Sequence, residues 1–141
     1  MSRFLALVAV LAFCGEALAC SCSRSTGPQR YADASFVFVG RVVAASLSPN
    51  PGLGEDLGRE IVRATVVPTD IYKGKVSGQY TVIGGSDYRN PVCTRALLVG
   101  AEYVFTLGPD MVASTCNAWH IDDTDIQESL KTFRRLKAQQ K

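Results

Sequence analysis

The arrangement of the cysteines constrains this chain more than any other feature of its sequence. Cys20 and Cys22 are separated by one serine, whereas Cys93 and Cys116 lie far along the chain. A disulfide between Cys20 and Cys22 would close a strained ring, so each is expected to pair with one of the two distant cysteines. Two connectivities remain open. Either would tie the start of the domain to its second half, and each bridge would add about 4 kcal/mol of stability through loop-closure entropy.

The residues before Cys20 are typical of an export signal. A basic residue precedes an apolar run from Phe4 to Cys14, which is too short to span a bilayer, and Ala17-Leu18-Ala19 suits a signal peptidase. We therefore expect residues 1–19 to be a signal peptide and residues 20–141 to form one secreted or periplasmic domain. Cleavage would leave Cys20 first, with a free α-amino group. The alternative is a lipobox, in which a lipid on Cys20 would anchor the protein to a membrane.

Charge and composition argue against several classes of function. The net charge is only +2, which gives no argument for a nucleic-acid partner or for binding a charged membrane surface. Apolar residues make up 47% of the chain, which is ample for one core. An exported protein rarely keeps thiolates free for zinc, so no cofactor is expected. The single histidine, His120, lies near Asp122 and Asp123 but in no motif for nucleophilic catalysis, so we expect no enzymatic activity.

The apolar pattern predicts five or six short strands. Phe36–Ser46 is the clearest, and because both of its alternate sets are apolar, most of it should be covered on both faces, with Gly40 marking a bend. Ile61–Val67 is a second strand, and Pro68 indicates an edge or a bulge there. The other segments with strand character are Gln79–Ile83, ended by Gly84-Gly85, then Leu97–Val99, Tyr103–Leu107 and Val112–Trp119.

A long loop and a helix complete the predicted fold. Leu47–Gly58 holds two prolines and three glycines, which is typical of an exposed loop. Apolar residues at helical spacing predict a C-terminal amphipathic helix, for which Thr124 and Gln127 would form a capping box. The apolar positions of this helix are Ile126, Leu130, Phe133 and Leu136. The chain is thus expected to be mainly β with one helix.

Several short motifs follow one another in a recognisable order. They are Cys20-Ser21-Cys22-Ser23, the strand from Phe36, Ile71-Tyr72-Lys73-Gly74, Cys93 before Leu97-Leu98, Gly100 and Glu102-Tyr103, and Cys116 before Trp119 and the helix. In this order the chain resembles the netrin-like domain of the tissue inhibitors of metalloproteinases. The resemblance covers residues 20–141. The animal inhibitors have a third disulfide and a second domain, so this chain resembles a minimal, single-domain relative.

The resemblance implies both a fold and a mode of action. The fold would be an OB-like five-stranded barrel with the C-terminal helix packed against it and with disulfides Cys20–Cys93 and Cys22–Cys116. In those inhibitors, the α-amino nitrogen and carbonyl oxygen of the first residue chelate the catalytic zinc of the protease. Cys20 would be the chelator here, and Ser21 would point into the protease pocket beside the metal.

Two functions stay open on the sequence. The protein could inhibit a zinc metalloprotease, with Cys22 and Ser23 continuing the contact made by the first two residues. It could instead be an extracellular or periplasmic interaction module for another protein, in which case the disulfides would serve only to brace a small domain.

Overall fold

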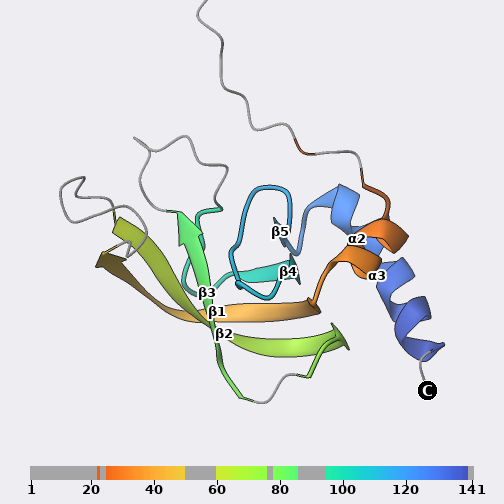
Figure 1. Cartoon of the computed structure of the whole chain (residues 1–141), viewed down its shortest axis with the longest axis horizontal. Coiled ribbons are helices and arrows are strands. Elements are labelled where there is room, and N and C mark those ends of the chain that lie inside the picture. The colour runs from red at the N-terminus through yellow and green to blue at the C-terminus, as the bar shows by residue number, and fades with distance from the viewer. Residues whose placement is uncertain (1–21, 23–24, 50–59, 76–77, 86–94, 140–141) are drawn as a thin grey trace, which may run out of the picture.

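A five-stranded antiparallel sheet forms the centre of the molecule (Figure 1). This computed structural model describes residues 22, 25–49, 60–75, 78–85 and 95–139. The strands are β1 (Phe36–Pro49), β2 (Glu60–Lys73), β3 (Tyr80–Gly85), β4 (Glu102–Leu107) and β5 (Ala118–His120). They lie in the order β3-β2-β1-β4-β5. The prediction of a mainly β fold with a C-terminal helix is confirmed. The predicted signal peptide, residues 1–19, lies outside the described residues.

Two helices lie together at one end of the sheet (Figure 1). They are α2 (Gly27–Asp33) and α3 (Thr124–Ala138). Ile126, Leu130 and Phe133 of α3 are buried, as their helical spacing predicts, and pack with Tyr31 of α2 against one face of the sheet. No helix among the described residues is long and apolar enough to cross a membrane.

The first half of β1 lies between two hydrophobic cores. Val37 and Val39 face the helices, whereas Phe38 and Val42 face a second core on the opposite side of the sheet. This second core also contains Val66, Val82, Phe105 and Leu107. The predicted coverage of both faces is therefore confirmed as far as Val42. It is wrong for Val43, which is exposed because neither core extends beyond Val42 at this end of the strand.

Gly40 and Pro68 lie opposite each other where the ladder between β1 and β2 is irregular. A Cβ atom on Gly40 would approach Cγ1 of Val66 to 2.5 Å, so only glycine fits without movement of its neighbours. β3 pairs only with residues 61–66 of β2, which leaves Pro68 on an edge where no amide donor is needed. The predicted bend and edge are thus confirmed.

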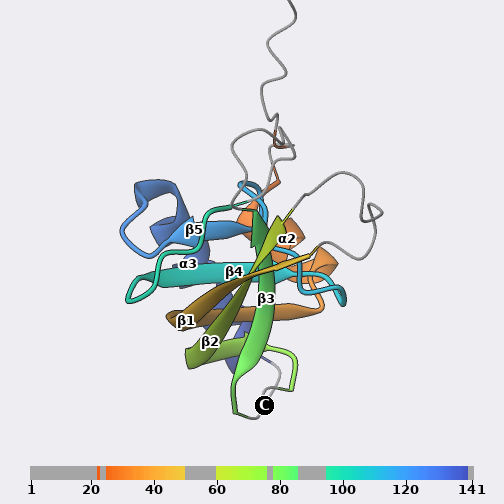
Figure 2. The same ribbon diagram turned by 90° about the vertical axis from the view of Figure 1, so that its left-hand side faces the viewer.

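A parallel bridge joins β3, at one edge of the sheet, to the connection between β4 and β5. Ile83 of β3 pairs with Val112, which lies in the connection between β4 and β5. The Ile83 N–H donates to the Met111 carbonyl (2.9 Å), and the Ala113 N–H donates to the Ile83 carbonyl (2.7 Å). The sheet is consequently curled, and Figure 2 shows β3 running across the direction of β4.

Several predicted boundaries are wrong. β3 continues through Gly84 and Gly85 because both residues pair with β2. Glycine is needed at position 84, where a Cβ would lie 2.7 Å from the Arg95 carbonyl oxygen. The predicted loop Leu47–Gly58 begins too early, since β1 continues to Pro49 by pairing with β2. Residues 50–59 lie outside the described part.

Two further strand predictions and one cap also need correction. Leu97–Val99 is not a strand but leads into a tight turn at Gly100, whose φ of +90° favours glycine. Of Val112–Trp119 only the last two residues belong to β5, because hydrogen bonds turn the preceding segment. The N-cap of α3 is Asp123, so Thr124 and Gln127 form no capping box.

Candidate functional site

A disulfide anchors the beginning of the domain to the connection between β4 and β5. Cys22 is bonded to Cys116, with their Cα atoms 5.3 Å apart and a separation of 94 positions in sequence. This is the pairing that the resemblance implies for these two cysteines. A disulfide is typical of an oxidising, extracytoplasmic compartment. Four other residues of the candidate site, Cys20, Ser21, Ser23 and Cys93, lie outside the described residues.

Asn117 organises the turn that holds Cys116. Its side-chain oxygen accepts a hydrogen bond from the Ser114 N–H (2.6 Å), and its side-chain nitrogen donates to the Val112 carbonyl (3.0 Å). The Cys116 N–H in turn donates to the Ser114 hydroxyl (3.1 Å). Sequence reasoning missed this role of Asn117. The run Ser114-Thr115-Cys116-Asn117 carried the signal, because short polar side chains that bond to the nearby backbone are typical of turns.

After Cys22, helix α2 gives the chain a second attachment to the rest of the domain. The Arg30 guanidinium donates to the hydroxyls of Ser25 and Ser129 (both 3.2 Å) and lies 4.7 Å from the centre of the Trp119 ring. The Lys73 ammonium donates to the carbonyl oxygen of Tyr31 at the end of the same helix (2.8 Å). These contacts join Ser25 and α2 to α3 and the sheet, so the chain is anchored again from Ser25 onward.

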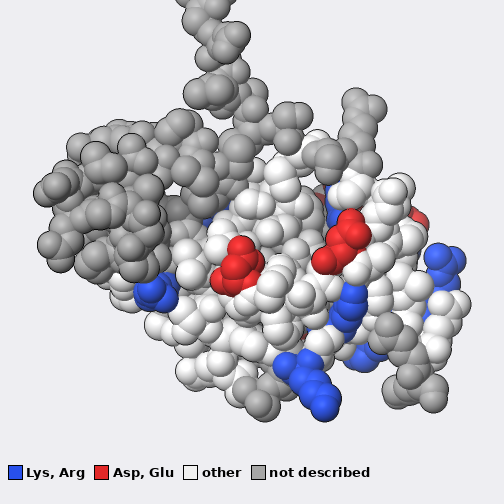
Figure 3. Space-filling view, in the orientation of Figure 1, with Lys and Arg blue, Asp and Glu red and all other residues white. Residues whose placement is uncertain are grey.

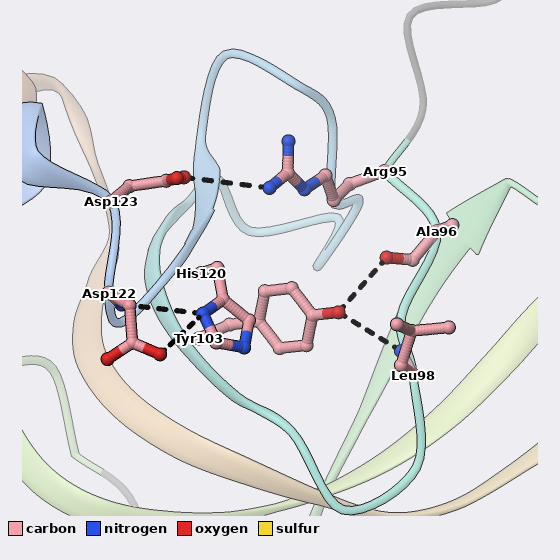
Figure 4. Close-up of polar contacts among 7 residues, drawn as sticks. All are labelled: Arg95, Ala96, Leu98, Tyr103, His120, Asp122 and Asp123. Atoms are coloured by element: carbon pink, nitrogen blue, oxygen red, sulfur yellow. Dashed lines mark hydrogen bonds and ion pairs between the residues drawn. The ribbon is translucent and has the colours of Figure 1, made fainter.

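The segment that follows Cys93 re-enters the described part at Arg95, beside the same connection (Figure 4). The Arg95 N–H donates to the Ala113 carbonyl (3.2 Å), and its guanidinium lies 3.6 Å from a carboxylate oxygen of Asp123. The Tyr103 hydroxyl accepts a hydrogen bond from Leu98 N–H (3.1 Å) and donates to the Ala96 carbonyl (3.3 Å). The connection between β4 and β5 therefore holds Cys22 through the disulfide to Cys116 and Arg95 through the hydrogen bond to Ala113.

His120 lies against the ring edge of Tyr103, with ring centres 5.6 Å apart. Its Nδ1 atom is 3.3 Å from the Asp122 carboxylate and also accepts a hydrogen bond from the Asp122 N–H (Figure 4). No serine hydroxyl among the described residues contacts the imidazole, so no Ser-His-Asp arrangement is assembled there. In the same part of the chain, no three His, Cys, Asp or Glu side chains are grouped to hold a metal ion.

A small open cavity of about 220 Å³ lies beside this region. It is lined by Trp119, Asp123, Thr124 and Asp125 at the start of α3. Its carboxylates already serve the helix N-terminus and the Arg95 ion pair. The cavity is therefore accounted for by the structure of this end of α3.

Tyrosines on the strands are mostly core residues and do not form an exposed stacking platform among the described residues. Tyr72 and Tyr103 are buried, and Tyr80 is half-buried against the Phe38 ring. On the face shown in Figure 3, the described acidic and basic side chains are scattered among uncharged ones. Neither feature is what a nucleic-acid surface presents.

Asp70 and Tyr72 of β2 have shifted pKa values where α3 crosses the sheet. Burial raises the pKa of Asp70, but hydrogen bonds from Lys137 and Tyr72 and the charges of Lys137 and Arg134 outweigh it, so the pKa lies below the ordinary value of 3.8. Burial, followed by the nearby Asp70 carboxylate, raises the pKa of Tyr72 to about 12. Both shifts belong to the packing of α3 and not to a reactive centre.

Comparisons with known proteins do not assign a family. No protein-family model matches this sequence, and no curated protein matches it. The functional argument therefore depends on the residues and their geometry.

Proposed function

We propose that this protein is a secreted netrin-like binding protein that inhibits a zinc metalloprotease through its own N-terminus. The observation that carries the proposal is the Cys22–Cys116 disulfide, which fixes the chain two residues after Cys20. A terminus held in this way loses little conformational entropy when it binds a target. Termini ordinarily fray, so such bracing is consistent with use of the terminus itself.

The sheet topology supports an OB-like barrel. In the order β3-β2-β1-β4-β5, the parallel bridge from Ile83 to Val112 joins the edge strand β3 to the connection that leads into β5. A five-stranded, partly open barrel has this kind of closure. The helices cover the outside of the sheet at the end where the N-terminal segment enters (Figure 1).

The described residues also support a second disulfide between Cys20 and Cys93. Each of these cysteines is two residues from an anchored position, Cys22 or Arg95, and two residues reach about 7 Å at most. Cys22 is bonded to Cys116, while the Arg95 N–H is bonded to Ala113, three residues before Cys116. Both free ends are thus close to the same turn, and the pairing needs no long excursion of either chain.

The chemistry of the first residue suits a catalytic zinc. Such a zinc keeps one coordination position open for water, which the amine nitrogen and carbonyl oxygen of Cys20 could take. An α-amino group titrates at about 7.7–8.0, so its proton is readily lost when it meets a metal. Ser21 would then point into the protease pocket next to the metal, and Ser23 would lie at the edge of the contact.

The proposal is tested by adding one residue before Cys20, which moves the α-amino group away from Cys20 and leaves the rest of the domain unchanged. The mature protein that starts at Cys20 is compared with a variant that carries one extra alanine before Cys20. The matched control carries the extra alanine after Lys141. We expect the mature protein and the control to inhibit at least one zinc metalloprotease, and the N-terminal extension to weaken inhibition at least 100-fold. Equal inhibition by all three proteins, or inhibition by none, would rule out zinc capping.

The remaining alternatives give different results in two further measurements. Mass spectrometry of the natural mature protein detects either a free Cys20 amine or a lipid, and a lipid would exclude both chelation and the Cys20–Cys93 bond. A protein with a free amine and intact disulfides that inhibits nothing would be an interaction module. In either case, replacing both Cys22 and Cys116 by serine should destabilise the fold by about 4–5 kcal/mol in urea unfolding.

A further inference from the structure

The outer half of β1, residues 43–49, has an open edge. On one side it pairs with β2 along its whole length. On the other side, β4 pairs only with residues 36–41, and the Gly100 turn adds two hydrogen bonds to Val42. Beyond Val42, no residue in the described ranges pairs with this side of β1. Among the described residues, its outward-facing N–H and C=O groups therefore have no partner strand and can accept another one.

Residues 43–47 of the outer half are also exposed to solvent, and the outer half contains no charged residue. Residues 43–47 are all exposed, and the exposed fraction is 43% for Val43 and 56% for Leu47. The neighbouring turn adds Leu98 (64%) and Val99 (60%) to the exposed apolar surface. The last charged side chain before this half is Arg41, which pairs with Glu102 (3.2 Å). Natural proteins usually protect a strand edge with lysine or another charge, and this edge has none.

We infer that the outer half of β1 pairs with the same segment of a second copy, antiparallel and related by a two-fold axis. Pairing centred on Ser46 places Ala45 of each copy opposite Leu47 of the other, so apolar side chains meet and no like charges are brought together. The register past the bulge is regular from Ala44 to Pro49, as such a ladder requires. This inference does not depend on the inhibitory function.

The size of the contact determines its strength. Seven strand residues span about 24 Å. One new ladder of this length, with the apolar turn at its rim, belongs to the small class of interfaces that bury less than about 1,200 Å². The dimer is therefore weak and forms with increasing protein concentration, in contrast to an obligate dimer.

The test relies on the proposed register, in which the Ser46 side chains of the two copies lie directly opposite each other at the two-fold axis. Sedimentation velocity of the full mature protein should show a monomer–dimer equilibrium that depends on concentration. Ser46→Lys and Ser46→Glu should each weaken dimerisation at least tenfold, because each places two like charges opposite each other. An equimolar mixture of the two variants should form a heterodimer and recover most of the association. Thr81→Lys, at an exposed position of the paired strand β3, is the matched control and should leave dimerisation unchanged.

The alternatives give distinct outcomes. A wild-type protein that stays monomeric to millimolar concentration would overturn the inference, and so would a dimer that both Ser46 variants retain. Loss of dimer without recovery in the mixture would exclude the two-fold pairing centred on Ser46. Circular dichroism of each variant separates these outcomes from unfolding, since substitution at an exposed strand position should leave the spectrum unchanged.

Discussion

The two halves of β1 are both composed mostly of apolar or small residues, but they have opposite surroundings. Residues 36–42 include four side chains that are fully or almost fully buried, Val37, Phe38, Val39 and Val42. Residues 43–47 are also mostly apolar or small, yet all are exposed. The difference arises from the neighbours, because β4, α2 and α3 flank only the inner half. Burial of a strand therefore depends on where its neighbours end as much as on its own residues.

The largest effect should come from removing an aromatic ring in the inner half. Phe38 is fully buried, and its ring stacks on Phe105 with centres 5.0 Å apart. We expect Phe38→Ala to lower the free energy of unfolding by about 3–5 kcal/mol. Leu47→Ala, in the outer half, should cost less than about 1 kcal/mol when both are measured by urea unfolding of the monomer. Similar losses for the two variants would contradict the comparison.

A smaller loss of stability should distinguish the last buried residue of the inner half from the first exposed residue of the outer half. Val42 is fully buried, whereas Val43 is 43% exposed. Val42→Thr places a hydroxyl in an apolar core and should destabilise the fold by about 1–3 kcal/mol. Val43→Thr changes the same atoms in contact with water and should stay within about 0.5 kcal/mol. Thermal and urea unfolding of the pair test this prediction, and equal costs would place the boundary elsewhere.

The smallest effect concerns the cover of the inner half by α3. Asp70 lies opposite Val39 in the ladder and pairs with Lys137 of α3 (3.0 Å). Because the folded pKa of Asp70 is lowered, its contribution to stability is present above the unfolded value near 3.8 and is lost as the pH falls through the folded value. Both side chains are 43% exposed, so this contribution should be below about 1 kcal/mol.

Lys137→Met should therefore reduce stability slightly at pH 7 and hardly at all at pH 2, and it should raise the Asp70 pKa measured by NMR. Lys131→Met is the control, since Lys131 pairs with Glu128 on the exposed side of the same helix (3.0 Å). An Asp70 titration that is identical in both variants would show that the ion pair does not hold α3 to the sheet.

Much of the fold was predictable because it depends on local patterns. The periodicity of Ile126, Leu130 and Phe133 predicted α3, and Gly40 with Pro68 predicted the irregular ladder. The exposure of Val43 was not predictable, because it depends on where β4 ends, and this is set by the distant turn at Gly100. The persistence of β3 through Gly84 likewise depends on pairing with β2, and the need for glycine there depends on the close passage of Arg95, which no pattern within the strand reveals.

In the candidate site too, some features follow from the local sequence and others depend on contacts between distant residues. The cysteine spacing predicted that the start of the domain is tied to its second half, as Cys22–Cys116 confirms. The run of short polar residues from Ser114 to Asn117 indicates a turn, but the part played by Asn117 depends on three hydrogen bonds that converge there, and their partners are set by the fold.

Because the Cys22–Cys116 disulfide closes a long loop, the molecule can stay in one piece even when its backbone is cut within that loop. Four of the five strands, β1 to β4, lie between the two cysteines. A protease that cuts once anywhere between them therefore produces two fragments that remain covalently joined. Such a nicked protein keeps its full mass until it is reduced, and its N-terminal segment stays attached to the half of the domain that contains β5 and α3.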